Sequence, residues 1–256
     1  YIPADLDDLA AFLASLPAQD PLHWVGLGSN LLVRDGGVRG TVIMTSGALS
    51  GLDILHGNVV RAEAGVASAK VARFCAEHEL VGAEFLAGIP GTVGGALAMN
   101  AGAFGGETWN IVEAVETIDR RGERRTRLPS DYQVSYRQIS GPVGEWFVAA
   151  HFRLKSGDAS QGKTLIKTLL AKRGATQPTQ LPNAGSVFKN PAGDHAARLI
   201  EVSGLKGTCE GKACVSDLHA NFIVNQGGAT AAEIERLISR VQATVENLHG
   251  VTLEPE

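Results

Sequence analysis

Cysteine is scarce in this chain, and its spacing argues against two common uses of the residue. Only Cys75, Cys209 and Cys214 occur, and no two of them form a C-x-x-C pair. An odd set of this kind argues against a disulfide framework and favours a reducing compartment, the cytoplasm. Cys209, Cys214 and His219 are evenly spaced, but they lack a close pair and a fourth ligand, so we predict no metal site.

The chain also lacks an excess of charge and any long apolar run. Its 23 lysines and arginines against 27 acidic residues give a formal charge of -4 and a pI near 6.0. This balance offers no basic surface for nucleic acid or for an anionic membrane, and we infer no obligate protein partner. No apolar run approaches the roughly 20 residues that cross a bilayer, and no signal-peptide pattern opens the chain. We predict a soluble globular protein, because 256 residues with 44% hydrophobic content can fill a core.

Hydrophobic periodicity predicts helices alternating with strands. A helix capped by Asp5 opens the chain, and Thr230 and Glu233 form a capping box for a last helix that stops at Gly250. The other predicted helices cover residues 68–78, 164–172 and 195–202, and the predicted strands cover 23–28, 41–46, 58–65, 111–119, 146–154, 212–216 and 221–225. This mixture predicts the α+β fold class.

A polar segment, "KSGDASQGK" at residues 155–163, marks the predicted domain boundary. We therefore predict a first region at 1–155, divided into 1–50 and 51–155, and a second domain at 156–256. No long-period repeat or low-complexity tract interrupts this division.

The stretch "GLGSNLL" at residues 26–32 follows a predicted strand. Its small residues let the backbone N–H groups of Gly28, Ser29 and Asn30 approach a pyrophosphate. Leu31 stands where the third glycine of a G-x-G-x-x-G fingerprint would fall, which disfavours a Rossmann domain. An ordinary turn after a strand is the alternative.

A second glycine-rich stretch, "FLAGIPGTVGGALAMNAGAFGGE" at residues 85–107, stays apolar throughout. Its composition fits neither a flexible linker nor a helix, and it predicts backbone laid against a ligand. Two such loops in one half of the chain favour an extended, phosphate-bearing cofactor such as a dinucleotide. The alternative is a surface loop that is unusually rich in glycine.

The segment "NAGSVFKNP" at residues 183–191 contains a single hydroxyl, that of Ser186. A nucleophilic serine would usually occupy a G-x-S-x-G turn, and this segment does not match that pattern. From these residues alone, a serine that hydrogen-bonds its own backbone in a turn is favoured.

Seven segments, taken together and in order, resemble one enzyme family. They are "GLGSNLLVRDGGVRG", "FLAGIPGTVGGALAMNAGAFGGE", "SYR", "NAGSVFKNP", "LIEVSGLKG", "HANFIVN" and the terminal "LEPE". They resemble the UDP-N-acetylenolpyruvoylglucosamine reductase (UDP-N-acetylmuramate dehydrogenase) family over nearly the whole chain. The short link between Arg137 and the last domain resembles the branch that lacks an extra substrate-covering insertion.

The resemblance implies a fold and a reaction. The fold is a two-part FAD-binding region of the PCMH/VAO-like type, followed by a smaller α+β substrate-binding domain. NADPH reduces bound FAD, and the flavin then reduces UDP-N-acetylglucosamine enolpyruvate to UDP-N-acetylmuramate in peptidoglycan precursor synthesis. The family pattern also predicts further residues before Tyr1 and after Glu256.

The resemblance implies three catalytic residues. Hydride addition to the vinyl carbon leaves negative charge that spreads into the substrate carboxylate, and Arg137 of "SYR" matches the cation that stabilises it. Ser186 matches the proton donor to the neighbouring carbon, which makes this serine an acid and not a nucleophile. Glu256 matches a residue that acts with the arginine at the carboxylate, whereas the residues alone indicate a solvated terminal acid.

Binding residues follow from the same correspondence. The implied cofactor contacts are Gly26, Leu27, Gly28, Ser29, Asn30, Leu31, Gly88, Ile89, Pro90, Gly91, Thr92, Gly94, Gly95, Asn100, Ala101 and Gly102. Lys189, Asn190 and Tyr132 are the implied substrate contacts, and the alternatives are a surface lysine and a packing tyrosine. His219 is predicted to be a structural histidine that bonds backbone carbonyls.

Two other functions fit parts of the sequence. An FAD-dependent sugar or lactone oxidase would share the first half of the chain but would not need Ser186 or Glu256. A noncatalytic nucleotide-sugar-binding protein would carry no flavin, and the apolar stretch at 85–107 argues against it. We predict the reductase.

Overall fold

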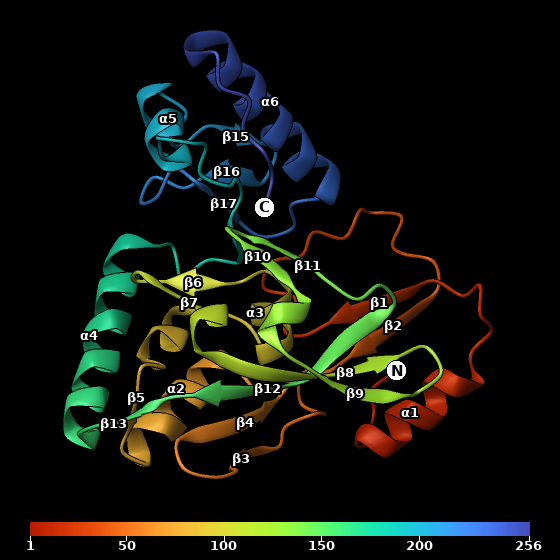
Figure 1. The fold of residues 1–256 in the computed structure, drawn as a ribbon. Helices are drawn as coiled ribbons and strands as arrows, with labels where there is room; N and C mark the ends of the chain where they lie inside the picture. Colours follow the sequence, from red (N-terminus) through yellow and green to blue (C-terminus); the bar gives the residue numbers. More distant parts are fainter. The chain divides into compact units, whose positions relative to one another are not determined.

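The computed structural model describes all residues of the chain, 1–256, and divides them into two compact units. Unit 1 contains Tyr1–Gly28 and Arg39–Leu170, and unit 2 contains Ser29–Val38 and Ala171–Glu256. The backbone therefore passes between the units three times. Figure 1 shows the helices and strands of both units. None of the helices combines the length and the apolar character needed to cross a membrane.

A five-stranded antiparallel sheet forms the centre of unit 1. Its strands lie in the order β3 (Leu52–Ile54), β4 (Val59–Glu63), β12 (Glu145–Arg153), β8 (Val112–Asp119) and β9 (Arg124–Arg127). The central strand, β12, pairs with β4 on one side and with β8 on the other. Since side chains alternate between the faces of a strand, one face carries the fully buried residues Val60, Ala62, Ala150 and Phe152.

Helices cover the buried face of this sheet. They are α2 (Ser68–Glu77), the 3-10 helix η1 (Glu84–Gly88) and α3 (Val93–Ala98), and their apolar residues join the same core cluster. The longer helix α4 (Ala159–Thr176) lies beside α2 (Figure 1). A Cβ added at Gly162 of α4 would lie 3.1 Å from Cβ of Ala76 in α2, so the small residue sets the helix spacing.

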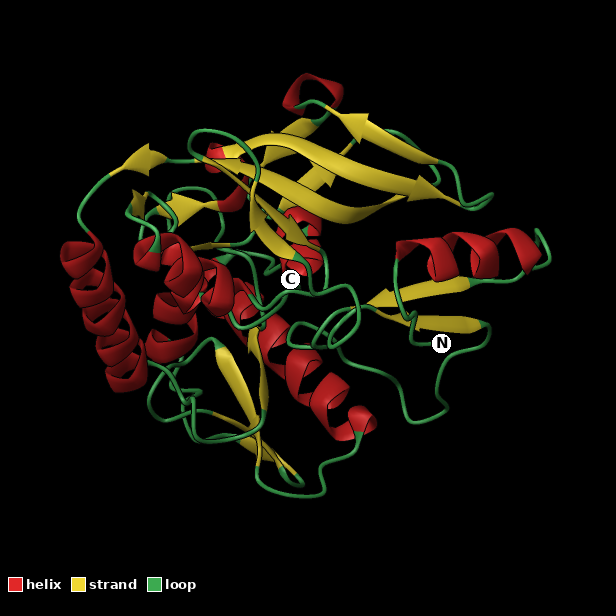
Figure 2. Ribbon diagram, turned by 90° about the horizontal axis from the view of Figure 1, so that it is seen from below, coloured by secondary structure: helices red, strands yellow, loops and turns green.

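The first helix begins where the sequence predicts. In α1 (Leu6–Ser15) the Asp5 carboxylate accepts hydrogen bonds from two backbone N–H groups of the first turn, at 2.9 and 2.8 Å. Figure 2 shows α1 running along the parallel pair β1 (Leu22–Val25) and β2 (Thr41–Met44). A second core cluster forms here from the buried side chains of Leu9, Leu13, Ile43, Leu49, Ile118 and Val148.

Short elements complete unit 1. Three antiparallel pairs are β5 (Leu80–Val81) with β13 (Lys155–Ser156), β6 (Gly102–Ala103) with β7 (Gly106–Glu107), and β10 (Gln133–Ser135) with β11 (Gln138–Ser140). Two further 3-10 helices, η2 (Thr108–Ile111) and η3 (Pro129–Asp131), precede β8 and β10.

Unit 2 is built on a four-stranded antiparallel sheet. Its strands lie in the order β14 (Asn183–Ser186), β17 (Phe222–Asn225), β16 (Ala213–Val215) and β15 (Cys209–Glu210). The helices α5 (Ala196–Val202) and α6 (Ala231–His249) share a third core cluster with this sheet. Its most deeply buried members include Phe188, Ile200, Leu237 and Val245.

The amino terminus of α6 is capped from two places. The predicted capping box is present: Thr230 Oγ1 accepts from Glu233 N at 3.2 Å, and the Glu233 carboxylate accepts from Thr230 N at 2.9 Å. Asp35 adds a second cap, because its carboxylate accepts from the first two backbone N–H groups of the helix at 2.8 and 3.0 Å. The segment Ser29–Val38 is thereby held to α6. Gly250 ends the helix at a φ of 66°, as predicted.

Two stretches contain more regular structure than the sequence predicts. The polar segment 155–163 contains β13 and the first turn of α4. The two compact units divide the chain at Leu170, within α4, and the predicted domain division at residue 155 stays a prediction. The stretch 85–107 is partly helical, because η1 and α3 lie within it. Tertiary packing offsets the weak helix propensity of Gly94 and Gly95 there.

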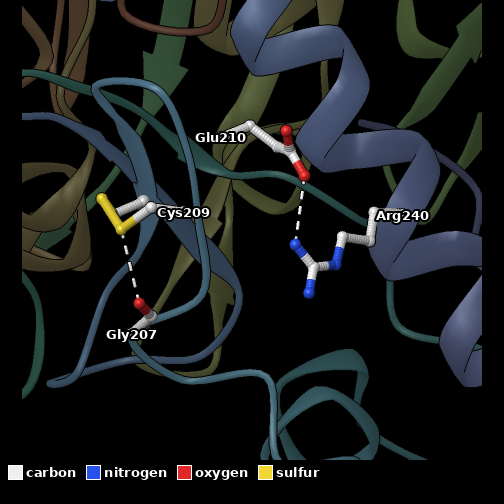
Figure 3. Close-up of a disulfide and its surroundings, with 5 residues drawn as sticks. Gly207, Cys209, Glu210 and Arg240 are labelled. Carbon is white, nitrogen blue, oxygen red and sulfur yellow. Dashed lines mark hydrogen bonds and ion pairs between the residues drawn. A yellow bond between two sulfur atoms is a disulfide. The ribbon is translucent and has the colours of Figure 1, made fainter.

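Cys209 and Cys214 form a disulfide, which corrects the expectation that the cysteines argue against one. The two residues face each other across β15 and β16, with their Cα atoms 4.1 Å apart (Figure 3). The number of cysteines did not reveal this bond, because the register of the hairpin makes the two residues neighbours. Neither sulfur is a thiolate that could join His219 at a metal, and no group of three metal-ligating residues is assembled in the structure. Cys75 is free and buried.

A charged network occupies the other face of the unit 1 sheet. Arg61 of β4 forms a bidentate ion pair with Glu116 of β8, with N···O distances of 2.6 and 2.8 Å, and His151 of β12 contacts the same carboxylate at 2.8 Å. Arg61 first, and His151 second, lower the pKa of Glu116 from 4.5 to about 2. The folded state therefore favours the ionised carboxylate.

We expect this carboxylate to contribute to acid stability. Because its pKa is depressed in the folded state, its contribution is complete above about pH 4.5 and is lost as the pH falls toward 2. Glu116→Gln should therefore reduce the free energy of unfolding at pH 7 and flatten its fall below pH 4.5, by about 1–2 kcal/mol after solvent screening. Urea denaturation at pH 7 and below pH 4.5 measures this free energy of unfolding. Glu77→Gln, at an exposed residue, is the control. Identical pH dependence in both variants would contradict the assignment.

Candidate functional site

Gly26 and Thr92 form the tightest part of a backbone cradle in unit 1. Gly26 directly follows β1, and Thr92 directly precedes α3. A Cβ at Gly26 would lie 2.2 Å from Thr92 Oγ1, so a larger residue requires a rearrangement there. The hydroxyls of Thr92 and Ser68 are buried and have no hydrogen-bond partner in the chain. Because buried hydroxyls nearly always find a partner, the cradle presents two polar groups that a ligand can satisfy.

The glycines of α3 differ in what surrounds them. A Cβ at Gly94 would lie 3.0 Å from Cβ of Ala64, so protein closes that side. A Cβ at Gly95 would meet no atom within 4 Å, and the residue is exposed. Gly28, in the turn after β1, has a φ of 74°, which L residues with a side chain rarely adopt. The cradle is therefore closed at Gly26 and Gly94 and open at Gly95.

Arg137 lies at the tip of the hairpin β10–β11, in the two-residue turn between Ser135 and Gln138. Its φ of 55° is left-handed, a conformation that is uncommon for any residue other than glycine. Its Nη1 contacts the carbonyl oxygen of Asn100 at 3.5 Å, and Asn100 Nδ2 donates to the carbonyl of Ser135 at 3.2 Å. Asn100 thus ties the hairpin tip to the end of the second glycine-rich stretch.

The side chain of Asn100 is used within the protein. It is 1% exposed, its Nδ2 also donates to the Glu107 carboxylate at 2.9 Å, and its Oδ1 accepts from Trp109 N at 3.2 Å. These bonds engage the side-chain amide of Asn100 within the protein, and contact of this residue with the cofactor stays a prediction. The structure therefore gives Asn100 a structural task, that of holding the loop.

Tyr132 lies in an aromatic cluster of unit 1. Its ring centroid is 4.8 Å from that of Trp109 and 5.6 Å from that of Phe147. Burial is the main cause that raises the pKa of Tyr132 to about 12, so its phenol is neutral at physiological pH. Tyr132 therefore packs against other aromatic side chains, as in the alternative that the sequence analysis left open.

Ser186 ends strand β14 of unit 2, where it pairs with Phe222. The turn before it is held by Asn183, whose Oδ1 accepts from Gly185 N at 3.0 Å. Gly185 has a φ of 83°, and a Cβ on it would lie 3.9 Å from the carbonyl oxygen of Ser29. Asn183, and not Ser186, therefore bonds the turn backbone, and the half-buried serine is not the turn-forming residue that its sequence context suggested.

The carboxyl-terminal tail lies alongside the segment that follows Ser186. Phe188 and Pro255 form an antiparallel bridge, Glu256 N donates to the carbonyl of Val187 at 2.9 Å, and Lys189 N donates to the carbonyl of Glu254 at 2.9 Å. The Glu256 backbone is therefore bonded to the residue next to Ser186. Glu256 is half-buried, which argues against the reading of a fully solvated terminal acid.

Three other predicted residues have partners in unit 2. Lys189 Nζ donates to the Glu254 carboxylate at 2.6 Å, and Asn190 Oδ1 accepts from the backbone N–H of the first residue of α5 at 3.1 Å. The ring nitrogen Nδ1 of His219 accepts from Asn221 N at 3.3 Å. His219 is structural as predicted, but it bonds a backbone N–H instead of carbonyls. Burial lowers its pKa.

Two buried side chains, one in each unit, escaped the sequence analysis. Ser68 was read only as the start of a helix, and the buried amide of Asn221 was read only as part of a strand. No local pattern marks either of them, because their surroundings are set by segments distant in sequence.

Comparison with known proteins places this geometry in a family. The family model "FAD binding domain" matches residues 1–126, and "UDP-N-acetylenolpyruvoylglucosamine reductase, C-terminal domain" matches residues 177–256. Proteins named UDP-N-acetylenolpyruvoylglucosamine reductase from Alkalilimnicola ehrlichii and Methylococcus capsulatus are each 60% identical over 256 residues. These alignments cover 100% of this chain and 86% and 84% of the two relatives. The chain belongs to the UDP-N-acetylenolpyruvoylglucosamine reductase family.

A solved structure of this reductase family has the same fold. The crystal structure of UDP-N-acetylenolpyruvylglucosamine reductase from Thermus caldophilus matches with a TM-score of 0.85 and 32% sequence identity, over 100% of this chain and 90% of that one. This match, together with the FAD-binding domain, confirms the predicted α+β fold with a two-part FAD-binding region. The chain is an FAD-dependent oxidoreductase, and membership of the reductase family decides against the oxidase and the noncatalytic binding protein.

The cradle of unit 1 fits the cofactor of the reductase family. Glycine at positions 26 and 94 lets the backbone close tightly, Gly95 leaves open space, and Thr92 and Ser68 offer unsatisfied hydroxyls. A pyrophosphate needs small residues and hydrogen-bond donors of this kind.

Proposed function

We propose that this protein reduces UDP-N-acetylglucosamine enolpyruvate to UDP-N-acetylmuramate with NADPH, in peptidoglycan precursor synthesis. The observation that carries the proposal is the 60% identity to named reductases over the entire chain. We place the reaction in the cytoplasm because NADPH and UDP-activated sugars are metabolites of that compartment.

FAD would be held in unit 1 by the cradle around Gly26, Thr92 and Gly95, and residues of both glycine-rich stretches would contribute backbone contacts. The bound flavin supplies the hydride that adds to the vinyl carbon of the substrate. Residues 1–155 are proposed as the FAD-binding region and residues 156–256 as the substrate-binding domain.

Arg137 is the proposed electrostatic stabiliser of the substrate carboxylate. Hydride addition leaves negative charge that spreads into this carboxylate, and a fixed guanidinium lowers the energy of that charge. The left-handed turn and the hydrogen bond from Asn100 Nδ2 to the carbonyl of Ser135 hold the hairpin tip, and the contact of Arg137 Nη1 with the carbonyl of Asn100 positions the guanidinium. A residue held in advance needs no reorganisation when the charge develops.

Ser186 is the proposed proton donor to the carbon next to the carboxylate. Ser186 is half-buried at the end of β14, and its hydroxyl is not needed for the preceding turn, because Asn183 accepts the hydrogen bond from Gly185 N there. Glu256 is proposed to act with the arginine at the carboxylate end of the substrate. The backbone bond from Glu256 to Val187 supports a fixed position for its side chain.

Substrate binding is proposed for Lys189, Asn190 and Tyr132. The lysine and the asparagine follow Ser186 directly, which favours contacts with the phosphates and the sugar of the same substrate. Both have partners within unit 2, Glu254 and the start of α5, so substrate contacts would compete with or add to those bonds.

Anaerobic visible absorbance tests the function directly. The purified protein should show a flavin band that NADPH bleaches and that UDP-N-acetylglucosamine enolpyruvate restores. A band that bleaches but does not return with this substrate would contradict the proposed reaction and leave the FAD-binding fold intact. Absence of any flavin after incubation with FAD would contradict the assignment of the cradle.

A further inference from the structure

Residues 187–189, which follow Ser186, bond the carboxyl-terminal tail on one side. On the other side they bond the buried residue Asn221. Asn221 is 4% exposed and lies one residue before β17. Its Oδ1 accepts from Phe188 N at 3.0 Å, and its Nδ2 donates to the carbonyl of Phe188 at 2.8 Å. Its own carbonyl accepts from Val187 N at 2.9 Å.

The side chain of Asn221 takes the place of a neighbouring strand just beyond the end of the β14–β17 ladder. The ladder between β14 and β17 stops at the pair Ser186 and Phe222. Beyond that pair, the amide of Asn221 offers one donor and one acceptor to Phe188, as a neighbouring strand would. The side chain of Phe188 is 2% exposed and fills the core of unit 2, so the segment is fixed from the side chain as well.

The opposite edge of the same segment carries the tail. The carbonyl of Val187 accepts from Glu256 N and the N–H of Lys189 donates to the carbonyl of Glu254, so these two groups bond the tail, whereas the groups of Phe188 between them bond the Asn221 side chain. Asn221 therefore sets the position of a middle strand that has Ser186 at its start and Glu256 on its far edge.

We propose that Asn221 is a positioning residue that holds Ser186 and Glu256 together for the step in which the substrate is protonated. This inference rests on the proposed function of those two residues. Asn221 touches neither substrate nor flavin in this scheme and acts through the backbone of Val187 and Phe188. Proton transfer depends steeply on donor geometry, so a small displacement of Ser186 slows that step.

Asn221→Ala and Asn221→Asp test the role, each measured as two half-reactions by stopped-flow absorbance on the FAD-loaded enzyme. We expect Asn221→Ala to leave flavin reduction by NADPH within about twofold of wild type and to slow reoxidation by substrate at least tenfold. KM for the substrate should change less than kcat. Asn225→Ala is the matched control, because Asn225 is at the other end of β17 and its Oδ1 bonds only the loop before α6 at 2.9 and 3.0 Å. Both of its half-reactions should match wild type.

Asn221→Asp adds a readout that a purely structural role would not change. A protonated aspartic acid presents one donor and one acceptor, as the amide does, whereas the carboxylate presents acceptors only and opposes the carbonyl of Phe188. The reoxidation rate relative to wild type should therefore recover as the pH falls. The neighbouring titratable groups are His219, the Lys189–Glu254 pair and Glu256, and they are the same in the wild-type reference.

The outcomes separate this inference from the proposed function. Equal slowing of both half-reactions by Asn221→Ala, or no recovery of Asn221→Asp at low pH, would overturn the positioning role. If reoxidation were normal in Asn221→Ala but slow in Ser186→Ala, the positioning role of Asn221 would be overturned. The role of Ser186 as proton donor would still stand. Normal reoxidation in Ser186→Ala would overturn the proposed function of the serine, and the positioning role with it.

Discussion

Ser186→Ala should leave flavin reduction by NADPH unchanged and slow flavin reoxidation by the enolpyruvyl substrate by about 10²–10⁴-fold, the usual range for loss of a general acid. The two half-reactions separate because only the second needs a proton on carbon. The substitution removes one oxygen atom, and Asn183 still holds the turn, so folding should be little affected. Stopped-flow absorbance under anaerobic conditions measures both rates.

Ser239→Ala is the control for this variant. Ser239 is on α6, and its hydroxyl donates only to the carbonyl of Glu235 at 3.0 Å, so both half-reactions should match wild type. If Ser186→Ala slowed both half-reactions by the same factor, the serine would be acting on flavin binding or on the fold, and its role as proton donor would be rejected.

Gly95→Ala should have opposite effects on the fold and on the cofactor. The residue is helical and a Cβ there meets no protein atom within 4 Å, so alanine should stabilise the protein without FAD by about 0.5–1 kcal/mol through helix propensity. If FAD lies over this open side of the cradle, the same methyl group would overlap the cofactor and weaken its binding by about tenfold or more. Thermal unfolding without FAD and FAD titration measure the two effects separately.

Alanine substitutions at two other glycines serve as comparisons for Gly95→Ala. Gly174→Ala in α4 also meets no protein atom within 4 Å, so it should raise stability similarly and leave FAD affinity unchanged. Gly26→Ala should lower both quantities, because its Cβ would lie 2.2 Å from Thr92 Oγ1. Wild-type FAD affinity in Gly95→Ala would show that the cofactor does not approach α3 at this point.

The parts of the fold that follow from the sequence are those with local causes. α1 begins at a capping residue, and α6 begins and ends at capping residues, all of which bond backbone groups within a few positions. In contrast, α3 contains Gly94 and Gly95, which are poor helix formers, and it exists because its apolar residues pack in the core of unit 1. Helix propensity, a property of the local sequence, does not reveal this packing.

The candidate site shows the same limit. A motif singles out Ser186, but the task of Asn221 depends on hydrogen bonds to Phe188, 33 positions earlier in the chain. The disulfide depends on the register of one short hairpin, which the number of cysteines does not reveal. The amide of Asn100 bonds other loops of the protein, up to 35 positions away, which no local pattern shows.

The carboxylate of Asp35 caps a helix that begins 196 positions later in the chain. During synthesis on the ribosome, residues 29–38 emerge long before α6 exists, so this segment has no helix to join until residues 231–249 have been translated. The early segment must wait exposed while unit 1 forms from the residues on both sides of it in the chain. Unit 2 therefore cannot complete its assembly before α6 has been translated, and a fragment starting at Ala171 would lack this helix cap from the outset.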